Sequence, residues 1–288
     1  MRKNFLSCFF FIFLYSLSCY SQDFNVMTFN LRYPNPDDGI HSWDNRRPLV
    51  TSLIRFHDVD LLGVQEAHRR QINEIDTDLP EYAWFGVCRT DGKIDPKPDG
   101  EFSAILYRKS RFTFLDGNTF WLSETPDKIG SVGWDAALPR IVTWAKFKDN
   151  KTGKVFFYFN THFDHIGVKA RNESAQLLLQ QIKLIAGNAE VVITGDFNCN
   201  ETEQPYHLMT NDSTSYHVTD AMTISQSPPY GPKGSFAGSF MISDLIDHRI
   251  DFIFVRNKVE VLKYAILSDS WNGNMASDHL PVIAEVRL

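Results

Sequence analysis

Hydrophobic and polar positions along this chain follow the period of a β-strand in some segments and that of an α-helix in others. The pattern therefore predicts a mixture of strands and helices. Apolar runs rich in aromatic and β-branched residues predict strands over residues 25–31, 60–64, 102–108, 111–120, 141–149, 154–161, 191–194, 250–255, 260–267 and 282–286. Helical spacing predicts helices over residues 43–56, 68–79 and 168–186, the last of which Gly187 ends. Many neighbouring strands with few long helices favour an α/β (α+β) fold, a four-layered sandwich of two packed mixed β-sheets flanked by helices.

The N-terminal segment has the pattern of a signal peptide. Arg2 and Lys3 precede an apolar run over residues 5–17, which is too short to cross a bilayer as a helix. We therefore expect residues 1–21 to be removed on export to the periplasm or the extracellular space. No linker or repeat interrupts the remainder, and we expect residues 22–288 to form one domain with no transmembrane segment.

The cysteines leave two alternatives open. Cys19 would be the lipid attachment site of a lipoprotein, which is a minor alternative because Ser16 stands where such signals usually have Leu. Beyond the leader, Cys88 and Cys199 would form one disulfide or stay unpaired, and the second interpretation is favoured.

The net charge of the chain bears on whether its substrate is a nucleic acid. The chain has 29 Lys and Arg against 35 Asp and Glu, a net charge of −6. Proteins that bind duplex DNA usually carry a basic surface, because neutralising phosphates drives their affinity. The acidic balance therefore favours a smaller or non-nucleic substrate and leaves a nuclease as an alternative.

Polar residues that carry chemistry stand repeatedly at the ends of the predicted strands. They are Asn30, Glu66, His162, Asp164, Asp196, Asn198, Asp251, Asp278 and His279. Carboxylates and amides are hard oxygen ligands, which suit Mg²⁺ or Mn²⁺. Such a set performs metal-assisted hydrolysis, in which the cation neutralises a phosphate and a carboxylate activates water.

Six short motifs carry a resemblance to a known family. In order, they are Thr28-Phe29-Asn30, Gln65-Glu66, Asn160-Thr161-His162, Gly195-Asp196-Phe197-Asn198, Arg249-Ile250-Asp251 and Ser277-Asp278-His279. This order resembles the endonuclease/exonuclease/phosphatase superfamily, whose members include deoxyribonuclease, sphingomyelinases and inositol-polyphosphate 5-phosphatases. The resemblance extends over about residues 23–288 and implies that residues 22–288 are a catalytic domain.

The resemblance implies a metal site. Glu66 is expected to be the main ligand of Mg²⁺ or Mn²⁺, and Asn30 beside it would hold the metal or a phosphate. Asp278 is expected to be an additional ligand or to support one.

The resemblance also implies catalytic roles. Asp196 would orient or deprotonate the attacking water, and Asn198 would hold a phosphate oxygen. His279 would contact the scissile phosphate while Asp251 fixes its ring. His162 would face the phosphate as a donor or an acid.

A further set of residues is predicted to contact the substrate. It comprises Arg47, Arg89, Arg140 and Arg171, which suit bidentate binding of an anion, together with Glu101, Trp134, Asp164 and His165. For the arginines a structural ion pair is an equal alternative. Trp134 would stack on a flat group or fill the core.

Three functions follow, in order of preference. The first is metal-dependent hydrolysis of a phosphodiester or phosphomonoester of a small or lipid-derived substrate, by a monomeric enzyme. The second is an exported nuclease that degrades DNA or RNA. The third is a non-catalytic binding module on the same fold, which would require losses among catalytic residues that the sequence does not show.

Overall fold

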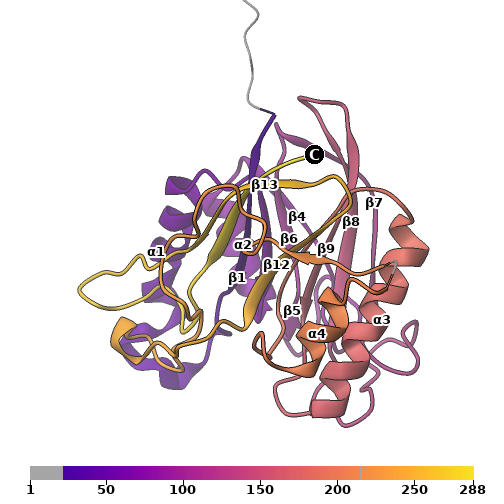
Figure 1. The fold of residues 1–288 in the computed structure, drawn as a ribbon. Helices are drawn as coiled ribbons and strands as arrows, with labels where there is room; N and C mark the ends of the chain where they lie inside the picture. The colour runs from indigo at the N-terminus through magenta and orange to yellow at the C-terminus, as the bar shows by residue number, and fades with distance from the viewer. Residues whose placement is uncertain (1–21, 215) are drawn as a thin grey trace, which may run out of the picture.

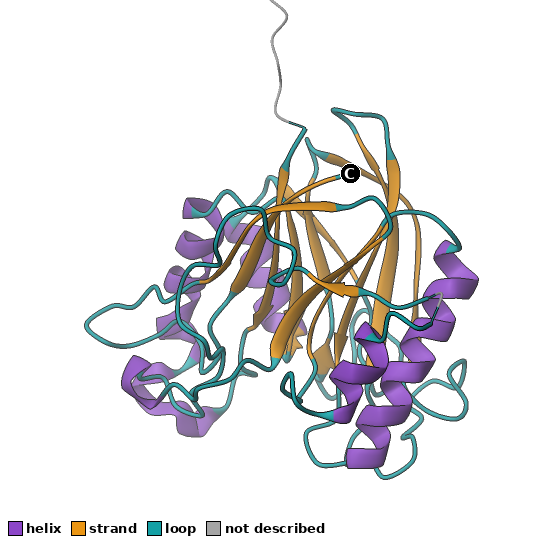
Figure 2. Cartoon of the chain, viewed as in Figure 1, coloured by secondary structure: helices purple, strands orange, loops and turns teal. Residues whose placement is uncertain are grey.

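Two six-stranded β-sheets lie face to face at the centre of the structure, and helices cover both outer faces (Figure 1, Figure 2). The computed structural model describes residues 22–214 and 216–288, so the predicted leader, residues 1–21, lies outside the described residues. The layers are those of the predicted four-layered sandwich, and the fold class is confirmed.

The first sheet has the order β13-β14-β1-β2-β6-β4, and the second has the order β11-β12-β10-β9-β8-β7. The first contains β1 (Phe24–Asn30), β2 (Leu61–Gln65), β4 (Tyr82–Phe85), β6 (Ile105–Arg108), β13 (Glu260–Ile266) and β14 (Val282–Arg287). The second contains β7 (Phe112–Trp121), β8 (Ile141–Asp149), β9 (Val155–His162), β10 (Val191–Asp196), β11 (Thr219–Asp220) and β12 (Asp251–Arg256). A small sheet pairs β3 (Ala67–His68) with β5 (Glu101–Phe102).

Each sheet has its own pair of helices. The helices are α1 (Trp43–Phe56) and α2 (Arg69–Asp78) on the first sheet, and α3 (Val168–Ala186) and α4 (Gln204–Thr210) on the second, with short 3₁₀ helices η1 (Pro36–His41) and η2 (Ile242–Asp244). Leu178 and Ile182 form part of the buried stripe of α3, and Gly187 takes a φ of 55°, a conformation that suits glycine at a helix end. None of the helices in the described ranges has the length and apolarity that a bilayer crossing requires.

The predicted elements differ from the structure in a few places. The predictions of helices over 43–56 and 168–186 are confirmed, but the prediction of one strand over 102–108 is wrong. That segment divides into β5 and β6, and at the break the carbonyl of Ala104 accepts hydrogen bonds from Val64 N and Asn160 Nδ2, each at 2.9 Å. The prediction did not include β4 or α4. Cys88 and Cys199 are buried and free, as favoured.

Alternation along the strands divides the apolar residues among three layers. In β1, Val26 packs between the sheets, while Met27 and Phe29 pack against the helices. In β10, Val192 faces the other sheet and Ile193 faces the helices. Side chains on a strand point alternately to its two faces. Every second residue after Val26 or Val192 therefore also points between the sheets, and we call each such series an inner row. In β1 and β10 those residues are polar.

A polar layer joins the two sheets just below the strand ends, and it is formed around Asn160 of β9. The amide of Asn160 donates to the carbonyls of Val64 and Ala104, and its oxygen accepts from Gln65 Nε2 at 2.7 Å and Thr194 Oγ1 at 3.1 Å. All four hydrogen-bonding positions of this buried amide are therefore used. Gly63 of β2 makes the close approach feasible, since a Cβ there would lie 2.2 Å from Thr194 Oγ1 and 2.4 Å from Asn160 Oδ1.

We predict that Gly63→Ala destabilises the protein by about 3 kcal/mol, because the added methyl group overpacks the polar layer. Urea denaturation measures the loss. Gly153→Ala is the control, since a Cβ at this exposed turn meets nothing within 4 Å and only its φ of +75° is unfavourable, at about 1 kcal/mol. Equal losses in the two variants would show that the polar layer tolerates the methyl group.

Candidate active site

The inner rows of both sheets become polar at one edge of the sandwich. β9 and β10 run parallel, so their last residues, His162 and Asp196, lie opposite each other. Asp251 opens the antiparallel strand β12 opposite Asp196. In the first sheet Asn30 ends β1, and Glu66 directly follows β2, which is parallel to β1. Strand register therefore gathers these five side chains from distant parts of the sequence.

Two further site residues come from the loop before β14, which is held against the end of β1. Ser277 Oγ donates to the carbonyl of Asn30 at 2.7 Å. The buried guanidinium of Arg46, on α1, donates through Nη1 to one main-chain carbonyl on each segment, at 2.7 and 2.9 Å. These bonds place Asp278 and His279 over the same edge.

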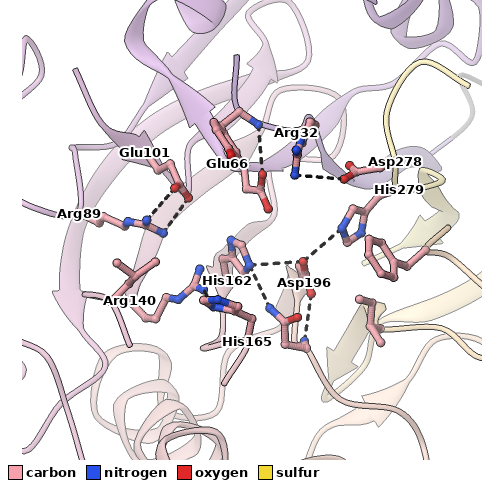
Figure 3. Close-up of a pocket in the computed structure, with 15 residues that line it drawn as sticks. Arg32, Glu66, Arg89, Glu101, Arg140, His162, His165, Asp196, Asp278 and His279 are labelled. Atoms are coloured by element: carbon pink, nitrogen blue, oxygen red, sulfur yellow. Dashed lines mark hydrogen bonds and ion pairs between the residues drawn. The ribbon is translucent and has the colours of Figure 1, made fainter. Parts of the chain in front are cut away.

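A pocket of about 290 Å³ opens at this edge (Figure 3). The predicted residues that line it are Glu66, Arg89, Glu101, Arg140, His162, His165, Asp196, Asn198, Asp278 and His279. Five further residues line the pocket and were not predicted: Arg32, Tyr33, Leu138, Phe236 and Ile250. Arg32 and Tyr33 closely follow the first motif and Ile250 is part of another, which was a usable signal, whereas nothing in the sequence pattern indicated Phe236.

Asp196 lies between His162 and His279 (Figure 3). Its Oδ2 accepts from Asn30 Nδ2 at 3.0 Å, and its Oδ1 accepts from the main-chain N–H of Asn198 at 3.0 Å. Burial, together with the negative charge of Asp251, raises the pKa of Asp196 to about 7, against the lowering effect of His279. A carboxyl group that titrates near neutral pH is suited to take a proton from water.

His279 is held by Asp251 on the side away from the pocket. Its Nδ1 lies 2.9 Å from Asp251 Oδ2, which also accepts from Ser235 Oγ at 2.7 Å. Burial alone lowers the pKa of His279, but the charge and hydrogen bond of Asp251 outweigh this and raise it to about 10. The protonated ring therefore presents Nε2–H, at 3.8 Å from Asp196 Oδ2.

His162 has the opposite protonation preference. Asn198 Nδ2 lies 3.0 Å from His162 Nε2 and also donates to the carbonyl of Phe163 at 3.0 Å, which fixes the orientation of the amide. The Nε2 atom of His162 is therefore an acceptor. Burial, followed by the positive charges of Arg140 and Arg89, lowers the pKa of His162 well below its usual value.

Glu66 and Asp278 form an acidic group on the first-sheet side of the pocket. Glu66 Oε1 accepts from Asn30 Nδ2 at 3.1 Å, and Asp278 Oδ2 lies 3.6 Å from Arg32 Nη1. Burial raises the pKa of Asp278, and the negative charge of Glu66 adds to this effect while His279 opposes it. Hard oxygen donors whose charges repel each other fit a divalent cation such as Mg²⁺ or Mn²⁺.

A second group of potential ligands fits a metal less well. Atoms of Asp196, Asp251 and His279 lie within 4.8 Å of one another. However, His279 Nδ1 is already hydrogen-bonded to Asp251 Oδ2 at 2.9 Å, and the raised pKa of His279 favours the protonated ring, which has no lone pair for a metal. Glu66 and Asp278 are therefore better suited to hold a cation, and the amide of Asn30 orients the Glu66 carboxylate.

The opposite wall of the pocket consists of paired charges (Figure 3). Arg89 binds Glu101 through two hydrogen bonds of 2.7 and 2.6 Å. Arg140 donates from Nε to Asp164 at 3.3 Å and contacts His165 Nδ1 through Nη2 at 2.9 Å. Asp164 itself is buried behind the wall and holds Arg140 in place.

Four residues predicted to contact the substrate do not line the pocket: Asp164, which lies behind the wall, and the three residues that follow. Arg47 joins α1 to α2 by a bidentate bond to Asp78, at 2.7 and 2.6 Å. Arg171 donates to the main-chain carbonyl of Asp164 at 3.1 Å, behind the pocket wall. Trp134 lines a separate shallow depression beside α3. Both arginines were predicted either to bind an anion or to form a structural contact. The structure shows structural contacts: Arg47 joins two helices, and Arg171 holds a loop.

The backbone is strained at three residues that line the pocket. Arg32, Glu66 and Asn198 follow strand ends closely and have φ values of 58°, 57° and 47°. Side chains other than glycine seldom adopt this left-handed region. Such strain persists where the surrounding structure imposes it, and it is concentrated at functional sites.

Comparison with known proteins identifies a family for this chain. The sequence model of the endonuclease/exonuclease/phosphatase family matches residues 27–279. A protein of that family from Bacteroides vulgatus is 40% identical, with a TM-score of 0.85 over 92% of this chain and 99% of its own. A mannosyl-6-phosphatase from Bacteroides thetaiotaomicron is 36% identical, with a TM-score of 0.85 over 92% of this chain and 100% of its own.

A more distant structure shares the fold. The catalytic domain of human Nocturnin is 20% identical, with a TM-score of 0.70 over 92% of this chain and 93% of its own. The extent of the family match and the identity to the bacterial proteins decide the classification. This chain belongs to the endonuclease/exonuclease/phosphatase family.

Proposed function

We propose that this protein hydrolyses a phosphomonoester of a small polar molecule, such as a sugar phosphate, with a divalent cation. The observation that carries the proposal is the position of Asp196 in a pocket of about 290 Å³, 3.4 Å from His162 Nε2 and 3.8 Å from Nε2 of His279, the ring that Asp251 holds. A relative that is 36% identical is named a mannosyl-6-phosphatase, which supports a sugar phosphate as the substrate class.

The chain's own residues supply positioning and proton transfer. Asp196, held by Asn30 and by the N–H of Asn198, orients a water molecule and accepts its proton. Protonated His279 donates through Nε2–H to a phosphate oxygen and neutralises part of its charge. Arg32, at the pocket edge, adds a second positive charge.

Glu66 and Asp278 would hold Mg²⁺ or Mn²⁺, with Asn30 beside them. When bound, such a cation neutralises phosphate oxygens and stabilises charge that develops in the reaction. The two carboxylates bring negative charge close to the expected position of the phosphate, and a cation removes this repulsion.

The alternatives are less well supported. A nuclease needs an open, basic track for the neighbouring nucleotides, whereas this pocket is small and its walls are internally paired. A non-catalytic module would not need an arrangement of Asp196, His279 and Asp251 that favours acid–base chemistry. Export and the monomeric state remain predictions from the sequence.

We predict that the protein, supplied with Mg²⁺, releases phosphate from mannose 6-phosphate, and that Asp196→Asn slows this release by at least about 10²-fold. The amide keeps the size of the carboxylate but cannot accept the proton. Asp149→Asn is the control, because Asp149 is equally buried but binds Arg111 outside the pocket and should affect stability instead. Near-native turnover by folded Asp196→Asn, or degradation of plasmid DNA in preference to sugar phosphates, would contradict the proposal.

A second prediction concerns the cation. EDTA should abolish turnover, and Mg²⁺ or Mn²⁺ should restore it. Mn²⁺ should also raise the melting temperature of the wild-type protein, because it binds only the folded site. Glu66→Ala should remove most of this shift, whereas Glu285→Ala, at a surface carboxylate paired with Lys263, should not. An unchanged shift in Glu66→Ala would place the cation elsewhere.

A third prediction concerns the pairing of His279 and Asp251. His279→Ala and Asp251→Ala should each strongly reduce kcat/KM, since both remove the oriented, charged imidazole. Their double variant should lose much less than the product of the two single losses, because residues that act as a unit are non-additive. Losses that multiply would mean that the two residues contribute independently, despite the 2.9 Å contact.

A further inference from the structure

We infer that the wall formed by Arg89, Glu101, Arg140 and His165 is a subsite for neutral hydroxyl groups of the leaving group. This inference rests on the proposed phosphatase function and deepens it, because it assigns the residues that select the substrate. The four residues line the same pocket as Asp196. In Figure 3 they lie on the side away from Asp278 and His279.

One nitrogen of the Arg140 guanidinium has no hydrogen-bond partner among the described residues. Its side chain is only 4% exposed, and Nε and Nη2 are used by Asp164 and His165. Nη1 is buried and has no hydrogen-bond partner within the described ranges of the chain. A buried guanidinium N–H without a partner is costly, and an acceptor on a ligand would relieve that cost. Arg140 also lines a narrow crevice that shares Arg89, Glu101 and His162 with the pocket.

His165 supplies a second donor. Arg140 is the only possible donor in its contact with His165 Nδ1, so Nδ1 accepts and the ring proton lies on Nε2. The His165 side chain is 48% exposed and lines the pocket, so this N–H is available to a ligand. Asp164 fixes both partners from behind, since it accepts from Arg140 and from the main-chain N–H groups of Ile166 and Gly167.

Glu101 supplies the acceptor. Its two oxygens bind Arg89 in a bidentate pair, and each oxygen keeps a lone pair for another donor. Arg89 is held in place by this pair and is not a free cation. The wall therefore combines fixed donors and fixed acceptors within one small volume.

This combination suits a hydroxyl group better than a second phosphate. A hydroxyl accepts one hydrogen bond and donates another, so hydroxyl groups of one leaving group can accept from His165 Nε2–H and donate to a Glu101 oxygen. The positive charges of Arg89 and Arg140 are balanced by the negative charges of Glu101 and Asp164. A second phosphate would meet the Glu101 carboxylate with no surplus of positive charge. The wall therefore favours a polyol carrying one phosphate and disfavours a bisphosphate.

The test compares three substrates of the intact protein with Mg²⁺: mannose 6-phosphate, p-nitrophenyl phosphate, which has no hydroxyl groups, and glucose 1,6-bisphosphate. For His165→Ala and Arg140→Lys, we expect the ratio of kcat/KM for mannose 6-phosphate to that for p-nitrophenyl phosphate to fall about tenfold or more. The matched control is Arg171→Lys, because Arg171 also bonds to Asp164 but does not line the pocket. This variant should keep the wild-type ratio.

Glu101→Gln provides an independent arm of the test. It keeps the size of the side chain and removes the negative charge, so the ratio of kcat/KM for the bisphosphate to that for mannose 6-phosphate should rise. Unchanged ratios in His165→Ala, Arg140→Lys and Glu101→Gln would overturn the subsite, because the wall would then not contact the leaving group. If the wild type cleaves p-nitrophenyl phosphate and has no preference for mannose 6-phosphate, the subsite fails and the phosphatase function stands. If it cleaves neither, both fail.

Discussion

The site depends on one buried amide that joins the two sheets. Asn160 donates to main-chain carbonyls next to the end of the first sheet and accepts from side chains of both sheets, directly below the strand ends where the pocket opens. A buried amide with all its bonds made holds its neighbours at fixed separations, and leaving one bond unmade would be costly. Glu66 belongs to one sheet and Asp196 to the other, so the distance between the proposed cation site and the proposed base is set by this layer.

Above that layer, two histidines in similar burial take opposite protonation preferences. The pKa of His162 is lowered because burial is reinforced by the nearby arginines. The pKa of His279 is raised because Asp251, directly behind its ring, outweighs burial. One histidine therefore accepts a hydrogen bond where the other donates one. The assignment of donor and acceptor in the pocket thus comes from the residues behind the rings rather than from the rings themselves.

The sequence predicted most of the fold and the polar centre of the pocket, since both follow from periodicity and strand ends. Asn30, Glu66, His162, Asp196 and Asp251 stand at or beside strand ends, and strand pairing gathers them within each sheet. Arg47 and Trp134 were predicted to contact substrate, but they lie outside the pocket because residue type alone does not show which partner a side chain finds. Phe236 was not predicted, because nothing in its local sequence indicates a contact with the site. It reaches the pocket through an isolated β-bridge to His279.

Three residues with a left-handed backbone, Arg32, Glu66 and Asn198, combine an unfavourable backbone conformation with a side chain that lines the pocket. Glycine at any of them would relieve the backbone strain and make the turn easier to form. It would also delete a side chain that lines the pocket. Substitutions that improve thermal tolerance at these turns would therefore tend to inactivate the protein, and attempts to stabilise it should begin elsewhere. In evolutionary terms, a relative with glycine at such a position would keep the fold but lack one of the side chains that line this pocket.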